Sequence, residues 1–349
     1  MKINRLRTAV VVVSMLGCAG SSLGWAGTAH HPSADYELVG DHPLGAPNFW
    51  DYLAYDPATH RVYASHVDRI EVVDVTTGKS VGQVGPLHDA HGVAVVPELG
   101  KGYADSGDDG VLEVFSLSDF HVLKTIKVSA DADGVIYDPT SKNVLVVAGD
   151  SHNLTIVSAA EDRVVRTVGL PGKPEFLAVD GHKHVYINIA DTASLSKVDL
   201  DTGAVVATWK LEGCERPHGL AYDPRIDRLF AGCANSRMIV VDAGNGRNLA
   251  SLPIGSNSDA VVVDSRRRRA FSANGDGTLT IVSEGDGDQY AVQRTIPTFF
   301  GGRNMAIDPK DGTLFLAHGN MKLMSGTKDL TQLRFGWDGL DLAIFEPLD

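Results

Sequence analysis

Seven ionisable residues recur along the chain at nearly equal intervals, and their types are those that bind ligands or perform acid–base chemistry. Successive members are 40 to 44 residues apart. Each stands two places before a short apolar segment, such as Leu53-Ala54-Tyr55-Asp56 or Leu220-Ala221-Tyr222-Asp223. These seven residues, called the column residues below, are Asp51, His91, Asp133, Glu175, His218, Asp259 and Arg303.

Three roles suit residues of these types. Imidazole and carboxylate groups bind zinc, calcium or manganese, which makes His91, His218 and Glu175 candidate ligands of a divalent metal. In acid–base catalysis, His91 or His218 would be the base and Glu175 or Asp133 would orient it or act as the acid. Arg303 would then stabilise a developing oxyanion or bind a substrate carboxylate. The third role is structural, because such residues also hydrate a channel or link neighbouring repeats.

A sequence repeat with a period of about 40 residues places the column residues. Each unit is interpreted as four short strands, and in four units the first strand ends in Asp-Pro, a turn-forming pair. Strands of this length bury their faces only when sheets pack against one another around an axis. The period therefore predicts an all-β, seven-bladed β-propeller with four-stranded blades. The column residues would enter the innermost strands and surround one mouth of the central channel.

A second set of residues recurs at the end of the second strand of the units, and we expect it to open toward the same mouth. On this interpretation His66 and His318 lie on adjacent blades and would extend the ligand site. The set consists of His66, Asp105, Asn188, Cys233, Asn274 and His318.

The last unit lacks a fourth strand, and the N-terminal segment has one to spare. Tyr36-Glu37-Leu38-Val39 precedes the first repeat, so we predict that it completes the last blade and removes an exposed sheet edge. Residues 320–340 interrupt the same blade, and we expect a long loop that packs as a lid over one end of the ring.

The charge and the first residues indicate the class of protein. The net charge is −13 at pH 7, which argues against a nucleic acid partner. Residues 1–29 have the basic start, short apolar run and small residues of a secretory signal peptide. Cys18 raises the alternative of a lipoprotein, but Leu16 stands where a small residue is expected. We expect a periplasmic or secreted monomer with a flexible N-terminus at 30–35, a propeller over 36–349 and no membrane span.

Two cysteines remain after removal of the signal peptide. Cys214 and Cys233 lie in one repeat, just before its first strand and at the end of its second. An oxidising compartment permits a disulfide between them, but sequence does not supply its geometry, so the paired and unpaired states both stay open.

Short motifs in the repeats resemble those of a known family. The run Asp-x-x-Thr-Gly before an apolar strand, at Asp74–Gly78 and Asp199–Gly203, resembles the YVTN repeat of YncE-like β-propellers. The resemblance covers about residues 36–349 and implies the seven-bladed fold and an exported location. Tyr63-Ala64-Ser65-His66 stands where the eponymous tetrapeptide is expected. Lactonase-type propellers share this architecture, which implies chemistry by His, Glu and Arg at one mouth.

These observations predict an exported binding propeller that holds a small molecule, a metal or a partner segment at its polar mouth. One alternative is a lactonase-type hydrolase that uses His91, Glu175, His218 and Arg303. A second is a structural module that binds proteins through another surface. No nucleophile elbow, phosphate-binding loop or dinucleotide fingerprint is found in the sequence.

Overall fold

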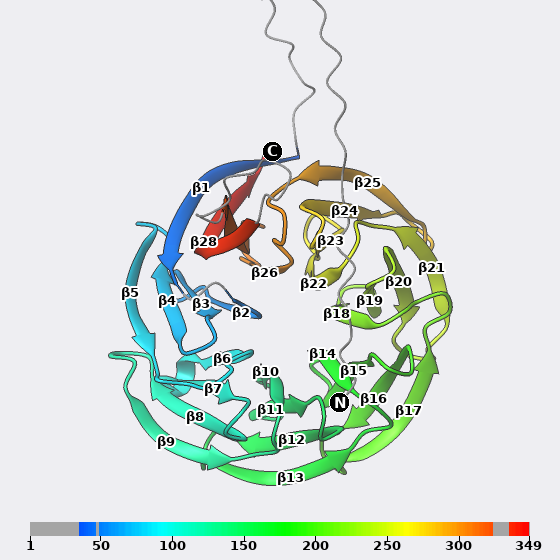
Figure 1. Cartoon of the computed structure of the whole chain (residues 1–349). Helices are drawn as coiled ribbons and strands as arrows, with labels where there is room; N and C mark the ends of the chain where they lie inside the picture. The colour runs from blue at the N-terminus through cyan, green and yellow to red at the C-terminus, as the bar shows by residue number, and fades with distance from the viewer. Residues whose placement is uncertain (1–34, 47–48, 324–334, 349) are drawn as a thin grey trace, which may run out of the picture. The chain divides into compact units, whose positions relative to one another are not determined.

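The chain folds into a seven-bladed β-propeller, as the repeat predicts (Figure 1). The computed structural model describes residues 35–46, 49–323 and 335–348. These residues form seven four-stranded antiparallel sheets, the blades. In blades 1 to 6 the strands follow chain order from the channel outward. Between the first two strands of blade 2 lies a 3-10 turn, η1 (Pro97–Leu99).

The strand bounds follow the expected repeat. Blades 1 to 3 contain β2 (Leu53–Asp56), β3 (Arg61–Ser65), β4 (Ile70–Asp74), β5 (Lys79–Val84), β6 (Val93–Val96), β7 (Lys101–Ser106), β8 (Val111–Ser116), β9 (Val122–Lys127), β10 (Ala132–Asp138), β11 (Asn143–Ala148), β12 (Asn153–Ser158) and β13 (Arg163–Gly169). Blades 4 to 6 contain β14 (Pro174–Val179), β15 (His184–Ile189), β16 (Ser194–Asp199), β17 (Ala204–Lys210), β18 (Pro217–Asp223), β19 (Arg228–Cys233), β20 (Arg237–Asp242), β21 (Asn248–Pro253), β22 (Ser258–Asp264), β23 (Arg269–Asn274), β24 (Thr278–Glu284) and β25 (Tyr290–Pro297).

The last blade is completed by the start of the chain, which confirms the predicted closure. Its strands are β26 (Asn304–Ile307), β27 (Leu314–Leu323), β28 (Phe335–Pro347) and β1 (Tyr36–Gly45). In Figure 1 the blue β1 lies beside the red β28, and the two pair in antiparallel register from Tyr36↔Pro347 to Gly45↔Leu340. The inner strands contact one another in cyclic order, and β26 also contacts β2, so the ring is closed.

Each blade buries its faces against its neighbours, which is why a closed ring is needed. Between blades 2 and 3, for example, Tyr103 and Leu112 pack with Val144 and Val146, all 0–1% exposed. A fully buried side chain of this kind contributes roughly 1.5–3 kcal/mol relative to exposure. The apolar core therefore lies between the blades, and the innermost strands are held firmly around the channel.

The turns form by the mechanism that their residues indicate. In the Asp56-Pro57 turn, the Asp56 carboxylate accepts hydrogen bonds from the Ala58 amide at 2.9 Å and the Thr59 hydroxyl at 2.7 Å. The three other Asp-Pro turns have the same bond from the amide two residues on. In the Asp74–Gly78 turn, Gly78 has a φ of +66°, a left-handed conformation that glycine adopts without a steric penalty.

The last blade differs from the expectation of a loop over 320–340. Strand pairing continues through Met321↔Trp337 to Leu323↔Phe335, so part of this segment is an extension of the β27–β28 hairpin. An antiparallel ladder continues beyond a blade wherever both chains stay extended, and our interpretation of apolar content as a loop overlooked this. Residues 324–334, and with them the expected lid, lie outside the described residues.

The start of the described chain is also held in place. Asp35, which we assigned to the flexible segment 30–35, accepts a hydrogen bond from Gln293 at 3.2 Å and lies 3.7 Å from the Arg269 guanidinium. Residues 1–34, including the expected signal peptide, lie outside the described residues. Within the described ranges, no helix is long and apolar enough to cross a membrane.

The closure through β1 predicts a large stability cost for Tyr36→Ala. Tyr36 is 2% exposed, its hydroxyl donates to the Gly312 carbonyl at 3.1 Å, and its ring packs edge-on against Phe271. We expect a loss of about 3–5 kcal/mol in the free energy of unfolding, measured by chemical denaturation. Leu38→Ala, at a 44% exposed position of the same strand, is the control, and equal losses in the two variants would contradict the predicted anchoring role.

Candidate functional site

The column residues stand where the inner strands leave regular pairing. Asp133, Glu175, His218 and Asp259 each fall within a register shift at the start of β10, β14, β18 or β22. Arg303 immediately precedes β26, and Asp51 and His91 each stand two residues before β2 and β6. Irregular pairing of this kind redirects side chains and is frequent beside functional sites. The repeat therefore brings seven ionisable side chains to one end of the channel.

Glycines let neighbouring blades approach closely beside two of these residues. A Cβ atom on Gly92 would lie 2.6 Å from the Val135 amide nitrogen, and one on Gly219 would lie 2.7 Å from that of Val261. Any larger residue would push the inner strands apart. The His-Gly pairs at 91–92 and 218–219 thus combine a functional side chain with the close approach that places it.

Members of the second set fix the backbone of the first. Asp105 accepts hydrogen bonds from the amides of His91 and Gly92 at 2.7 and 2.9 Å. Asn188 donates to the carbonyls of His218 and Gly219 at 2.8 and 3.0 Å. These buried side chains position both histidines through their main chain.

One half of the site is centred on His91. Its Nδ1 atom lies 2.8 Å from an Asp51 carboxylate oxygen and 3.6 Å from one of Asp133. Its Nε2 atom lies 3.3 Å from Asp89. The three ligand-type atoms of Asp51, His91 and Asp133 lie within 4.8 Å of one another. Three successive blades therefore present a compact group of one imidazole and two carboxylates.

The other half is centred on His218. Its Nδ1 atom lies 3.3 Å from both Glu175 and Asp259. Asp259 also binds the Arg303 Nε atom at 2.9 Å. Asn304 joins the two halves, because its side-chain nitrogen donates to Asp51 at 3.1 Å and to Asp259 at 3.3 Å. All seven column residues thus belong to one connected ionic network.

The network keeps both histidines protonated through neutral pH. Burial alone lowers the pKa of His91, but the hydrogen bond and charge of Asp51 outweigh it and raise this pKa to about 11. Burial likewise opposes protonation of His218, and hydrogen bonds to Asp259 and Glu175 overcome it, raising the pKa to about 10. Burial and the charge of Asp51 raise the pKa of Asp133 to about 8.

Tyr52 lies near this network and also lines an apolar cavity. Burial raises the pKa of Tyr52 well above its ordinary value, and the charges of Asp133, Asp51, Asp259 and Glu175 raise it further. Its ring packs edge-on against that of Phe176, with 4.5 Å between the ring centroids. Both rings line a mainly apolar cavity of about 220 Å³ between the inner strands of blades 1 to 4.

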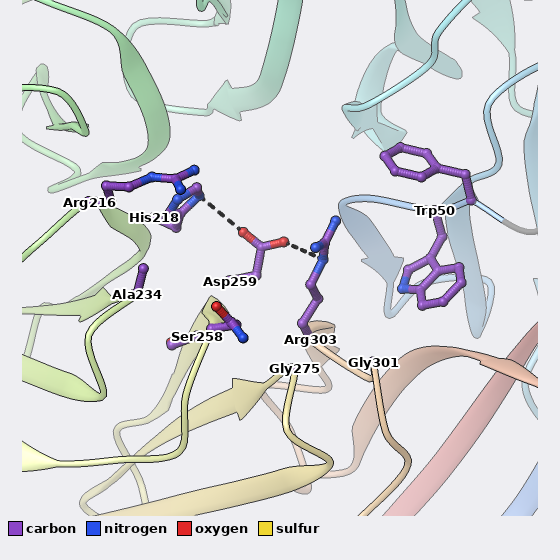
Figure 2. Close-up of a pocket in the computed structure, with 11 residues that line it drawn as sticks. Trp50, Arg216, His218, Ala234, Ser258, Asp259, Gly275, Gly301 and Arg303 are labelled. Atoms are coloured by element: carbon purple, nitrogen blue, oxygen red, sulfur yellow. Dashed lines mark ion pairs between the residues drawn. The ribbon is translucent and has the colours of Figure 1, made fainter. Parts of the chain in front are cut away.

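A larger pocket of about 510 Å³ opens beside His218. Figure 2 shows His218, Asp259 and Arg303 joined in a line along it, with Trp50 beyond Arg303. Its other lining residues come from the loops and strand ends at the same mouth: Phe49, Arg216, Ala234, Asn257, Ser258, Gly275 and Gly301. Three cationic side chains, Arg216, His218 and Arg303, therefore face this pocket with one carboxylate, Asp259.

Cys214 and Cys233 form a disulfide with a Cα–Cα distance of 5.5 Å. Cys214 lies at the start of blade 5, two residues before Arg216. The disulfide joins it to Cys233 at the end of the second strand of that blade. The Arg216 carbonyl accepts from the Ala234 amide at 3.2 Å, and its backbone has a left-handed φ of +49°. The disulfide and these backbone features hold the loop that carries Arg216 at the pocket.

The two histidines of the second set do not both extend the ionic network. His318 is buried, stacks on Phe299 at 3.7 Å and pairs with Asp41 of β1 at 2.9 Å, so it belongs to a separate group with Asp341. His66 is fully buried at the end of the second strand of blade 1. The candidate metal ligands also divide differently from expectation, because His91 is grouped with Asp51 and Asp133 whereas Glu175 contacts His218.

The sequence did not indicate five residues of the site: Phe49, Trp50, Tyr52, Arg216 and Asn304. Tyr52 and Asn304 each follow a column residue. Their side chains are neutral at pH 7, so they lack the charge by which the column residues were recognised. Arg216 and Trp50 lie outside the column in loops. Arg216 could have been suggested by its position two residues after Cys214.

The raised pKa of His218 predicts how stability depends on pH. A histidine with a folded pKa of about 10 contributes stability that is complete below its ordinary value of about 6.5 and is lost as pH rises toward 10. In a buffer with a chelator, we expect the free energy of unfolding to fall between these pH values by roughly 2–4 kcal/mol more in the wild type than in His218→Gln. Denaturation at a series of pH values measures this.

The control for this pH series is His121→Gln. His121 is exposed and pairs with Asp119 at 2.6 Å, so this variant should keep the wild-type slope. A His218→Gln protein with the wild-type slope would contradict the assignment of a bound proton to the network.

Comparison with known proteins establishes the fold alone. No protein-family model matches the chain, and no curated protein matches it. Among solved structures 1788 chains match, so the fold is widespread. One of them is Kuenenia stuttgartiensis hydrazine synthase, with a TM-score of 0.68 and 15% sequence identity. The match covers 90% of this chain and 99% of that chain. At that identity the likeness shows a shared propeller and assigns neither ligand nor reaction.

Proposed function

We propose that the protein is a binding propeller that holds a small organic carboxylate in the pocket between Arg216 and Arg303. The observation that carries this proposal is the lining of the pocket, in which three cationic side chains accompany a single carboxylate. A pocket of about 510 Å³ lies within the range of small-molecule sites. The chain as a whole is acidic, so the excess of positive charge is confined to this pocket. Positive charge at one pocket favours an anionic ligand there.

Arg303 is oriented to meet such a ligand. Its Nε atom is engaged by Asp259 at 2.9 Å, and its side chain remains 39% exposed. The guanidinium group is planar and binds carboxylates through two parallel hydrogen bonds. Because Asp259 is itself fixed by His218 and Asn304, the direction of Arg303 is set before a ligand arrives.

Aromatic side chains supply the apolar part of the pocket. Phe49 is 41% exposed and Trp50 is buried, and both line the wall of the pocket. Aromatic rings beside charged groups suit ligands that combine a flat or apolar body with an anionic end. This arrangement favours aromatic or branched carboxylates over inorganic anions.

The protonation of His218 favours binding over the lactonase-type alternative. A general base must be unprotonated at the working pH, whereas the carboxylates around His218 raise its pKa to about 10. The imidazolium instead adds a positive charge to the pocket wall. A lactone panel tests the alternative: hydrolysis abolished by both His218→Ala and Glu175→Gln would favour the hydrolase.

The binding proposal is tested by calorimetric titration with small aliphatic and aromatic carboxylates, each compared with its neutral amide. We expect at least one carboxylate to bind saturably while its amide does not. Arg303→Gln should weaken that binding about tenfold or more, because a charge-assisted hydrogen bond contributes roughly 1.5–3 kcal/mol.

Arg163→Gln is the matched control for this titration. Arg163 lies on the outer strand β13, is 61% exposed and pairs with Glu161. This variant should bind like the wild type. Equal binding of acids and amides, or equal affinities in the Arg303 and Arg163 variants, would contradict the proposal.

We also propose that the protein is exported and is a YncE-like propeller. The signal-peptide pattern of residues 1–29, the Asp-x-x-Thr-Gly turns and the disulfide support this proposal. Expression of the full chain in a Gram-negative bacterium should yield a periplasmic protein whose mass lacks the N-terminal segment. Retention of the uncleaved chain in the cytoplasm would contradict it.

A further inference from the structure

We propose that Asp51, His91 and Asp133 bind a divalent transition metal ion at the channel side of the mouth. The proposal rests on different residues from the carboxylate pocket and does not depend on it. The ligand atoms are Nδ1 of His91, Oδ2 of Asp51 and Oδ1 of Asp133, and the two contacts made by Nδ1 measure 2.8 and 3.6 Å. The ion would replace the proton that Nδ1 shares with these carboxylates, and that proton would pass to solvent.

The spacing of these atoms suits a metal. Zinc binds imidazole nitrogen and carboxylate oxygen at about 2.0–2.2 Å, which places neighbouring tetrahedral ligands about 3.4 Å apart. The observed separations lie on either side of this value, and all three atoms lie within 4.8 Å of one another. Small rotations of the two carboxylates would therefore bring all three atoms to coordination distance of one ion.

The groups around the ligands match those of established metal sites. A metal-bound histidine commonly donates its other nitrogen to a carboxylate, which orients the ring. Here the Nε2 atom of His91 faces Asp89 at 3.3 Å. The second oxygen of Asp51 accepts a hydrogen bond from Asn304 at 3.1 Å. Both a ligand histidine and a ligand carboxylate thus have partners that hold them in place.

A buried acceptor beside the group points to a further ligand. Asn304 is fully buried, and its Oδ1 atom has no hydrogen-bond partner among the residues that the structure describes. Leaving a buried polar atom unpaired costs about 1–3 kcal/mol. The nitrogen of the same amide donates to Asp51, one of the proposed ligands. A water on an open coordination position would satisfy Oδ1.

The mixed donor set selects the class of metal. Imidazole suits zinc, iron, copper and nickel, while carboxylates also accept manganese. Calcium and magnesium prefer sites made of oxygen ligands alone. One nitrogen and two oxygens on three rigid blades therefore favour a first-row divalent ion, with an open position toward the channel.

A second group of similar composition provides the competing location. Asp41, His318 and Asp341 also bring ligand atoms within 4.8 Å. Asp41 is exposed on the outer strand β1. The ring of His318 stacks on that of Phe299, with 3.7 Å between the ring centroids. An ion there would link the strands of the last blade rather than face the channel, so the two locations are separable by mutation.

Equilibrium dialysis of the chelator-treated full chain against Zn²⁺, with metal content measured by mass spectrometry, tests the proposal. We expect one ion per chain in the wild type, lost in His91→Gln and in Asp133→Asn. Asp89→Asn should weaken binding about 10–100-fold, as removal of an orienting carboxylate does. Cobalt substitution should give the visible absorption of a low-coordinate site in the wild type and not in His91→Gln or Asp133→Asn.

His88→Gln is the matched control, because His88 lies three residues earlier on the same blade, is 66% exposed and pairs with Asp109. It should bind zinc like the wild type. Circular dichroism in the presence of chelator establishes that each variant is folded. Absence of zinc binding in the wild type would overturn the proposal. So would binding that survives His91→Gln but is lost in His318→Gln.

Discussion

The structure depends on the close packing of blades that cannot bury their faces alone. A four-stranded sheet of this size leaves both faces apolar, and each face is covered only by the next blade around the ring. The ring must therefore close, which it does through β1 and its anchor Tyr36. Closure also brings the seven inner strands into close contact. Glycines such as Gly92 and Gly219 allow the backbones of neighbouring inner strands to approach one another. The positions of the column residues are a direct result of this packing.

The same packing determines the electrostatics of the mouth. Crowding four carboxyl groups into a partly buried ring is unfavourable unless each charge has a partner or the group keeps its proton, as the raised pKa of Asp133 indicates. His91 and His218 serve as those partners and hold protons that free imidazoles would release near neutral pH. Asn304 connects the two halves, and Arg303 balances Asp259. The result is a divided site, with a compact metal-type group on blades 1 to 3 and a cationic pocket between blades 5 and 7.

Much of the fold could be predicted from the sequence because the repeat is regular. Seven anchors, their turn signals and one surplus strand specify the number of blades and their closure. The extension of the β27–β28 hairpin could not be predicted, since apolar residues in an irregular segment do not distinguish a loop from a continued ladder.

The spacing of the column indicated that its residues share one end of the channel. It did not indicate their partners, because side-chain rotamers and the distance between blades decide that His91 meets Asp51 and Asp133. Arg216 lay beyond this reasoning, since a left-handed backbone and a disulfide bring it to the pocket.

The central claim is that the column residues act as one ionic network rather than as seven independent side chains. Nuclear magnetic resonance of histidine-labelled protein in chelator-containing buffer tests it most directly, by following the imidazole signals of His91 and His218 with pH. The account predicts that both rings stay protonated beyond pH 8, and that Asp51→Asn lowers the pKa of His91. Titration of both rings at or below the ordinary value of about 6.5 would contradict it.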